Sequence, residues 1–232
     1  MMSRSHAMTE WAGWGTSVGT LALAAATLVA VRSSSRMARI AERALLAGQR
    51  PVLAASRPHD PPEQVQFADG RVFEVGSGRA LVEQQPEVVY LAIPLRNVGA
   101  GIAQLRGYRL EPEPAERVMQ DPLGPARHRR GDTAPDPSLF AEQQRDLYIA
   151  AGDVGFWQAA LRDPSSPLYA AMEDAIQTGG RITVDLLYGD HEGGQPTITR
   201  FVLLPGEGHR WRCDVTRHWS LAPADVKSLS GS

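Results

Sequence analysis

The sequence predicts a mainly β protein with an N-terminal transmembrane helix and a helical stalk, followed by an Ig-like β-sandwich with a two-helix insertion. Three observations predict it: an uncharged apolar stretch near the N-terminus, arginines at helical spacing directly after it, and short alternating runs separated by proline and glycine from residue 50 onward. The expected division is an N-terminal tail over 1–10, the transmembrane helix over 11–31, the stalk over 32–49, the sandwich over 50–222 and a C-terminal tail over 223–232.

The composition narrows the classes of function. The chain has 232 residues, 43% of them hydrophobic, so it can bury a substantial core. Its formal net charge of −2 provides no general attraction for nucleic acid, and we expect no nucleic-acid partner. The single cysteine, Cys213, excludes an internal disulfide framework and a cysteine-based zinc site, and we expect no cofactor.

The stretch from Trp11 to Val31, WAGWGTSVGTLALAAATLVAV, carries no charged residue. About 20 residues at helical rise cross the hydrocarbon core of a bilayer. A cleaved signal peptide is the alternative, but the stretch is long for a signal core and no small-x-small site precedes the arginines. We therefore expect a retained anchor in the lipid bilayer.

Basic residues on the two flanks of this stretch predict its orientation. Arg32, Arg36, Arg39 and Arg43 follow it, whereas Arg4 is the only arginine before it. Arginine-rich flanks stay in the cytoplasm, so we expect a single-pass membrane protein whose soluble domain is cytoplasmic. The four arginines could contact anionic lipid headgroups. The apolar residues between them could lie on the membrane, pair with a second copy or pack as a solvated stalk on the protein's own domain.

Alternating runs predict the strands of the sandwich. In the last run, Trp211 and Trp219 fall on the inner side and Asp214 and His218 on the outer side. Arg217 is out of phase, which suggests a bulge or the end of the strand. Short strands with turns at this spacing are typical of a two-sheet sandwich. Strands are expected over residues 52–55, 64–67, 71–75, 80–83, 88–95, 181–188, 197–204 and 209–221.

Two other kinds of segment interrupt the strands. Residues 111–137 are polar and proline-rich, which predicts a long loop. The helical insertion is expected over residues 153–179. Its first helix spans 155–162 after Asp153, a candidate cap, and its second spans 167–178 and ends at two glycines.

The stretch LRNVGAGIAQ, residues 95–104, has two glycines at the spacing of a dinucleotide-binding loop. That fingerprint requires a third glycine, where this chain has Gln104, and a helix after it, where this chain soon reaches Glu-Pro-Glu-Pro. The fingerprint therefore fails. We expect a structural bend between two strands, in which Asn97 bonds locally and Gly99 and Gly101 allow a close approach of the backbone.

The anchor and several further motifs carry a resemblance to a known group. The motifs are RPVL at 50–53, RNVGAGIA at 96–103, GDVGFWQAALRD at 152–163, VDLLYGDHEGGQPTITRF at 184–201 and WRCDVTRHW at 211–219. In these the chain resembles uncharacterised single-pass membrane proteins of actinobacteria with a β-sandwich-like soluble domain. The resemblance implies a cytosolic or surface sandwich on a stalk. The group carries no established activity, so no functional residue is transferred from it.

Two sets of polar residues are candidates for chemistry. Asp190, His191 and Glu192 are consecutive in a turn and could hold a metal ion, although three consecutive residues rarely converge on one ion and a polar turn is the simpler interpretation. Asp185 and His218 could form an acid–base pair if their strands are neighbours. Cross-strand salt pairing explains the same residues more simply.

Two further sets are candidates for binding. The basic residues Arg127, Arg129 and Arg130 in the polar loop could contact anionic lipid or an acidic partner, or be solvated. Phe156 and Trp157, at the start of the first expected helix, either fill the core or present an anchor to a partner, and we favour the core.

The leading functional hypothesis is a membrane-anchored, non-enzymatic binding or scaffold module for an unknown protein partner. The alternatives are a membrane-tethered enzyme, such as a hydrolase using the polar residues above, and an exported domain that binds envelope ligands. The sequence leaves enzymatic activity undecided.

Overall fold

The computed structural model describes residues 27–42, 44–45, 48–122, 133–192, 194–206 and 210–222. The chain divides into two compact units, Met1–Ala47 and Gly48–Ser232. Most of the predicted anchor, residues 11–26, lies outside the described residues, as do Arg43 of the stalk and the loop residues Arg127, Arg129 and Arg130.

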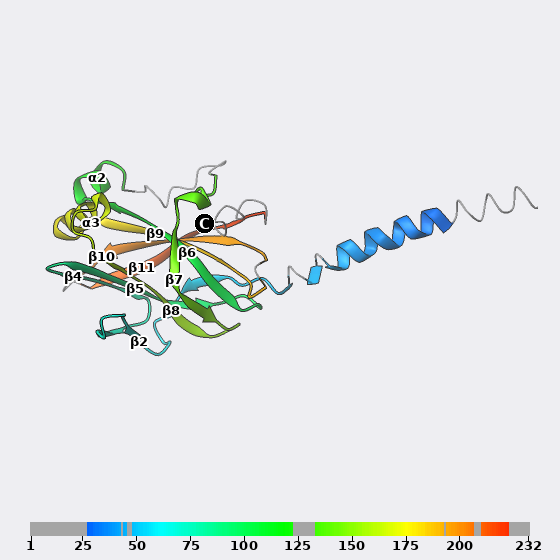
Figure 1. Cartoon of the computed structure of the whole chain (residues 1–232), viewed down its shortest axis with the longest axis horizontal. Helices are drawn as coiled ribbons and strands as arrows, with labels where there is room; N and C mark the ends of the chain where they lie inside the picture. The colour runs from blue at the N-terminus through cyan, green and yellow to red at the C-terminus, as the bar shows by residue number, and fades with distance from the viewer. Residues whose placement is uncertain are drawn as a thin grey trace, which may run out of the picture. The chain divides into compact units, whose positions relative to one another are not determined.

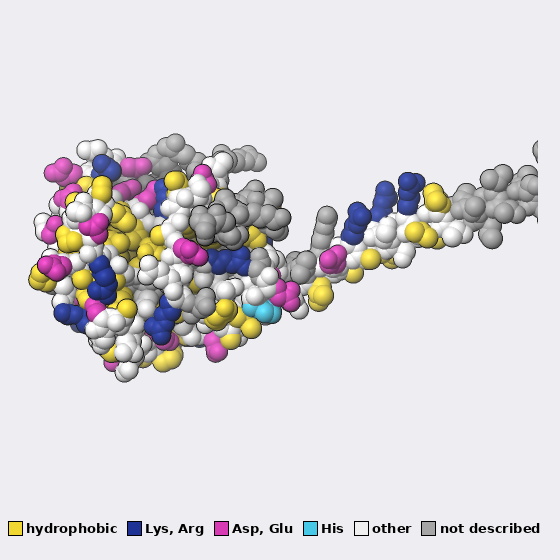
Figure 2. Space-filling view, viewed as in Figure 1, with side chains coloured by type: hydrophobic (Ala, Val, Ile, Leu, Met, Phe, Trp, Pro, Cys, Tyr) yellow, Lys and Arg dark blue, Asp and Glu magenta, His cyan; other side chains and the backbone are white. Residues whose placement is uncertain are grey.

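The described part of the first unit is helical over residues 27–42 and 44–45. Arg32, Arg36 and Arg39 follow each other at intervals of four and three residues, which places them on one face. The exposed Met37 points away from this face, whereas the exposed Ile40, one turn after Arg36, lies beside it. Figure 2 shows these basic side chains along one side of the helix, with hydrophobic side chains mainly opposite. No helix in the described part is both long and apolar enough to cross a membrane.

The second unit is a curled antiparallel sheet with few helices (Figure 1). This confirms the mainly β class. Its elements are β1 (Leu53–Ala55), β2 (Glu63–Gln66), β3 (Val72–Val75), β4 (Arg79–Gln85), β5 (Val88–Asn97), β6 (Ala103–Glu113), α2 (Ala115–Gln120), η2 (Pro137–Leu139), β7 (Ala141–Ile149), β8 (Val154–Leu161), α3 (Pro167–Thr178), β9 (Arg181–Gly189), β10 (Thr197–Pro205) and β11 (Trp211–Ser220).

The strand order is β1-β5-β4-β11-β10-β9-β6-β7, and β8 pairs with β5. The sheet folds over where β4 meets β11, at the pairs Ala80–Trp211 and Arg79–Arg212. On the opposite side, β7 pairs only with β6 and β8 only with β5 among the described strands, so the curled sheet is open between β7 and β8. A separate ribbon, β2–β3, has its own two-stranded pairing.

The main core lies inside the curl. Trp157, Tyr188, Phe201 and Leu91 come from four different strands and are fully buried there. Each such side chain contributes about 1.5–3 kcal/mol by leaving water. The helix α3 adds Met172 to this core.

A second cluster lies under the β2–β3 ribbon. Val65 and Phe67 of the ribbon region pack against Tyr90 and Ala92, which point out of the opposite face of β5. Phe67 and Tyr90 meet edge to face with ring centroids 4.8 Å apart. The ribbon therefore covers the outer face of β5 and β8 and shapes the surface beside them.

The suspected irregularity at Arg217 is a β-bulge. Arg200 is opposite Arg217, but the next residue, Phe201, is opposite Val215, so β11 has one extra residue. After the bulge the faces exchange. Trp219 packs with Ile198 outside the main core, and its predicted place on the inner side with Trp211 is wrong.

Each predicted strand is present, with bounds that differ by a few residues. The helix expected over 155–162 is wrong, because these residues form β8. Both faces of β8 are covered, so its sequence shows no clear alternation. The second helix is confirmed as α3, with Ser166 capping its first turn and Gly179 in the left-handed conformation at its end.

The predicted loop over 111–137 is wrong at its start. β6 continues to Glu113 and α2 follows it directly. The strands β6 and β7 are additions to the predicted set, and the expected two-helix insertion is a strand followed by one helix.

Candidate functional site

The bend between β5 and β6 is organised by the buried side chain of Asn97. Its Oδ1 accepts hydrogen bonds from the backbone N–H groups of Val52, at 3.2 Å, and Gly99, at 3.0 Å. Its Nδ2 donates to the carbonyl oxygens of Gly101, at 2.6 Å, and Ile149, at 3.0 Å. One amide thus joins β1, the bend and the end of β7. We call Asn97, the bend 98–102, the turn 150–153 and residues 49–52 the corner.

The two glycines of the bend lie against the chain that enters the second unit. A Cβ atom on Gly99 would lie 2.2 Å from the carbonyl oxygen of Arg50, and one on Gly101 would lie 1.8 Å from that of Gln49. Both positions exclude any side chain. The role of this sequence motif in the structure is close backbone packing.

The candidate acid Asp185 is buried rather than on a solvent-facing surface. Its carboxylate accepts two hydrogen bonds from Arg200, each 2.7 Å long, and Arg109 lies 3.9 Å away. The strand β10 separates β9 from β11, so Asp185 and His218 are not on neighbouring strands. The predicted acid–base pair is therefore not formed, and Asp185 takes part in a buried ion pair.

The bulge in β11 moves His218 away from the face of Asp214 and onto the face of its opposite residue Thr199, where the histidine remains exposed. Its Nδ1 is 2.8 Å from the hydroxyl of Thr199, which is 2.8 Å from the hydroxyl of Tyr188. The Tyr188 hydroxyl accepts a hydrogen bond from the backbone N–H of Leu53. Partial burial lowers the pKa of His218, which favours the neutral ring.

Cys213 is buried in the main core, as its alternation predicts. Burial, with a smaller contribution from Asp214, raises the pKa of its thiol, so a thiolate is disfavoured. This position has the character of a packed apolar residue.

Asp190 closes the loop between β9 and β10. Its Oδ1 accepts a 2.6 Å hydrogen bond from the N–H of Gly194, while His191 and Glu192 are exposed. Within the described ranges no three His, Cys, Asp or Glu side chains are grouped as metal ligands would be. The carboxylate of Asp190 thus stabilises the loop.

Phe156 and Trp157 point to opposite faces of β8. Trp157 is fully buried in the main core and meets Tyr108 edge on, with centroids 5.3 Å apart. Phe156 is partly buried and packs in the cluster under the β2–β3 ribbon. Both aromatics fill the two layers of the protein rather than stand free for a partner.

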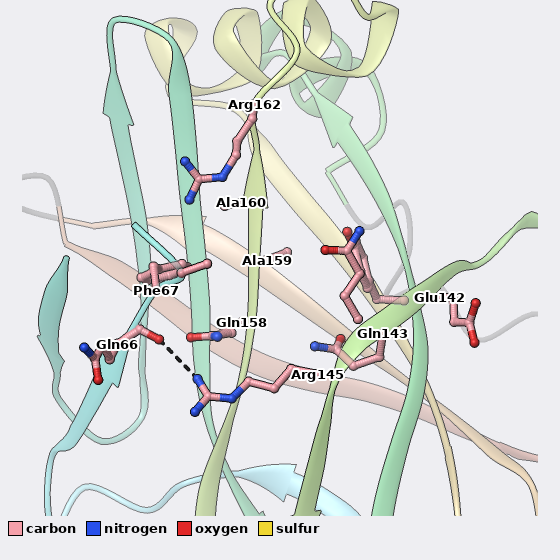
Figure 3. Close-up of a pocket in the computed structure, with 12 residues that line it drawn as sticks. Gln66, Phe67, Glu142, Gln143, Arg145, Gln158, Ala159, Ala160 and Arg162 are labelled. Carbon is pink, nitrogen blue, oxygen red and sulfur yellow. Dashed lines mark hydrogen bonds between the residues drawn. The ribbon is translucent and has the colours of Figure 1, made fainter. Parts of the chain in front are cut away.

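A groove of about 740 Å³ lies where the sheet is open between β7 and β8 (Figure 3). We call it the seam groove. The residues that line it are 66–68 at the end of β2, 142–145 of β7, 158–160 of β8, Arg162 and Tyr108.

A wide bulge in β7 shapes one wall of the groove. Leu147 is opposite Leu105 and Glu142 is opposite Gly107, so four residues of β7 face a single residue of β6. The backbone between these pairs therefore departs from β6. Figure 3 shows Gln143 and Arg145 extending from this bulge towards β8, whereas Glu142 points away. Arg145 crosses the groove and donates a 3.4 Å hydrogen bond to the carbonyl of Gln66.

Three polar atoms beside the seam groove are buried without a hydrogen-bond partner in the described part of the protein. They are Oε1 of Gln143, Oε1 of Gln158 and Nε1 of Trp157. Buried polar atoms are nearly always paired, so each of these costs free energy as the structure stands. The two amides belong to opposite walls of the groove.

A charged cluster forms the end of the groove next to Arg162. The hydroxyl of Tyr90 donates to Asp69, and Arg162 pairs with the same carboxylate at 3.0 Å. The hydrogen bond from Tyr90 is the main reason that the pKa of Asp69 falls from 3.8 to about 2. Asp69 therefore stays ionised and holds Arg162 at the rim.

The groove residues are absent from the candidates that the sequence suggests. The run AEQQRDLYI over β7 is polar and contains a bulge. It therefore shows neither the alternation typical of a strand nor a known binding motif. Its paired glutamines are the only local signal. The other walls come from distant segments that a single sequence does not bring together.

No protein-family model and no curated protein matches the chain. Among solved structures, an X-ray structure of a Northeast Structural Genomics Consortium target is similar at 10% identity and a TM-score of 0.21. The match covers 81% of this chain and 96% of that chain. A similarity at this level assigns neither a family nor a function.

Proposed function

We propose that the protein is a membrane-anchored, non-enzymatic binding or scaffold module of the actinobacterial single-pass group it resembles. Its soluble domain, an Ig-like sandwich in this proposal, faces the cytoplasm. The observation that carries the binding function is the seam groove, where two glutamine oxygens on opposite walls are buried without a partner in the part of the chain that the structure describes. A ligand with N–H groups would satisfy both.

The candidate catalytic groups already have structural partners, which favours binding over catalysis. Asp185 is paired with Arg200, and Asp190 closes a loop. His218 bonds to Thr199. A general acid or base needs reach to a substrate, and none of these three residues lines the seam groove.

The helix over residues 27–42 supports the membrane part of the proposal. Arg32, Arg36 and Arg39 form a basic face beside an apolar one, an arrangement suited to the surface of an anionic membrane. Fusing reporters that act only inside or only outside the cytoplasm after Ser232 tests the orientation. A cytoplasmic signal in the membrane fraction is expected, and an external signal contradicts this part.

Site-specific photo-crosslinking in intact cells tests the binding function. A photoreactive residue replaces Gln144, which is exposed at the groove, and in a matched control it replaces Arg212, which is exposed on β11. We expect a discrete adduct from position 144 in the membrane fraction and none from position 212. The same pattern from both positions, or no adduct from position 144, contradicts a binding function at this site.

A further inference from the structure

We propose that the seam groove binds an extended peptide segment of a partner protein, which adds as a strand to the free edge of β8 and places an acidic side chain beside Arg145. The inference rests on the proposed binding function and names the kind of ligand.

The first argument is the free strand edge. β8 runs from Val154 to Leu161 and pairs with β5 along its length. Among the described strands, none pairs with its other edge. Alternate residues of an antiparallel strand direct their N–H and C=O groups to each side, so half of these groups face the groove. Such an edge is a template for another strand.

The second argument is the shape of the opening. β7 and β8 are joined by the short turn 150–153, yet each pairs with a different neighbour. The two strands therefore diverge from the turn, and the bulge in β7 increases the separation. The groove runs along the second half of β8, at residues 158–160 and Arg162, where a short extended segment could lie.

The third argument is the chemistry of the walls. The buried side-chain oxygens of Gln143 and Gln158 have no donor among the described residues, and the N–H groups of an extended peptide are such donors. Arg145 is exposed, and its hydrogen-bond partner among the described residues is the carbonyl of Gln66, at 3.4 Å across the groove. Because Arg162 is already paired with Asp69 and Glu142 points away, Arg145 supplies the positive charge available to a ligand.

The test measures binding of the full-length protein, in detergent micelles, to three pools of nine-residue peptides on beads. One pool has glutamate at the central position, the second has lysine there, and the third has the glutamate and N-methylated alternate backbone amides. We expect the glutamate pool to retain the protein at least about tenfold more strongly than the lysine pool. N-methylation should abolish retention, because it removes the N–H donors of the added strand.

Two variants test whether any peptide binding occurs at the seam groove. Arg145→Glu, at an exposed position, should reverse the preference between glutamate and lysine. Arg212→Glu, on the exposed face of β11, should leave it unchanged. Hydrogen exchange of β8 amides should slow when a retained glutamate peptide is added.

Three results overturn the inference. They are equal retention of all pools, retention that survives N-methylation, and a preference that Arg145→Glu does not change. If the crosslink from position 144 is nevertheless found, the binding function stands and the partner docks by other chemistry.

Discussion

The corner and the seam groove lie at opposite ends of the strand pair β7 and β8. Their buried amide side chains differ in hydrogen bonding. At the corner, Asn97 uses both of its amide atoms in four hydrogen bonds to backbone groups. At the groove, Gln143 and Gln158 leave their oxygens without a partner in the described part of the chain. A fully paired buried amide stabilises the fold, whereas an unpaired one beside an opening gains a hydrogen bond when a ligand or water supplies the donor.

The corner should respond most strongly to added volume. In Gly99→Ala, the new Cβ atom would meet the backbone of Arg50 and Val52, which cannot move without disturbing β1. We expect a loss on the order of 4 kcal/mol in the free energy of unfolding, measured by chemical denaturation. Gly48→Ala is the control, because no atom lies within 4 Å of its added Cβ. Equal stability of the two variants would show that the corner is not closely packed.

Removing the amide at the corner should have the next largest effect. Asn97→Ala leaves two N–H groups and two carbonyls near β1 and β7 without their partner. We expect a loss of about 2–4 kcal/mol in the free energy of unfolding. A loss below about 1 kcal/mol would mean that water replaces the side chain and that the corner is open to solvent.

The ion pair between Asp60 and Arg96, beside the corner, should make the free energy of unfolding depend on pH. A hydrogen bond from Arg96, with a second from the backbone of Arg57, lowers the pKa of Asp60 from 3.8 to about 2. A lowered pKa in the folded state stabilises the protein above pH 3.8, and this contribution is lost as the pH falls towards 2.

The measurement compares unfolding of the wild type and Asp60→Asn between pH 2 and pH 7. We expect the difference in unfolding free energy between the two proteins to be constant near neutral pH. It should shrink as the pH falls towards the pKa of Asp60. When Arg96→Gln is also present in both proteins, this difference should depend much less on pH. A difference that is independent of pH would contradict the pairing.

A substitution in the seam groove should change the free energy of unfolding least. Gln158→Ala removes an amide whose oxygen has no partner among the described residues, so we expect less than about 1 kcal/mol of change in the free energy of unfolding. The same variant should weaken crosslinking from position 144. A large loss of stability would place Gln158 with Asn97 as a structural residue.

The sequence predicts the elements whose pattern is local. β9, β10 and β11 follow from alternation, α3 from its cap and its terminal glycine, and the bulge from the phase of Arg217. The helix expected over 155–162 fails because β8 is covered on both faces and therefore lacks a period of two. β7 is missed because its polar run contains a bulge.

The sequence does not predict the seam groove, for a different reason. Its walls come from segments around Gln66, Tyr108, Arg145 and Gln158, which only the curl of the sheet brings together. The unpaired state of the glutamine oxygens depends on their surroundings in three dimensions. By contrast, the bend at Asn97 could be proposed from residues that are close in the chain.

Residue-resolved hydrogen exchange along β5 and β8 of the full-length protein tests the central claim most directly. The account predicts that amides of β8 bonded to β5 are strongly protected, while the alternate amides facing β7 exchange at least about a hundredfold faster. Uniform protection along both edges of β8 would contradict the account, because it would show that the seam is closed and that no edge is free for a partner strand.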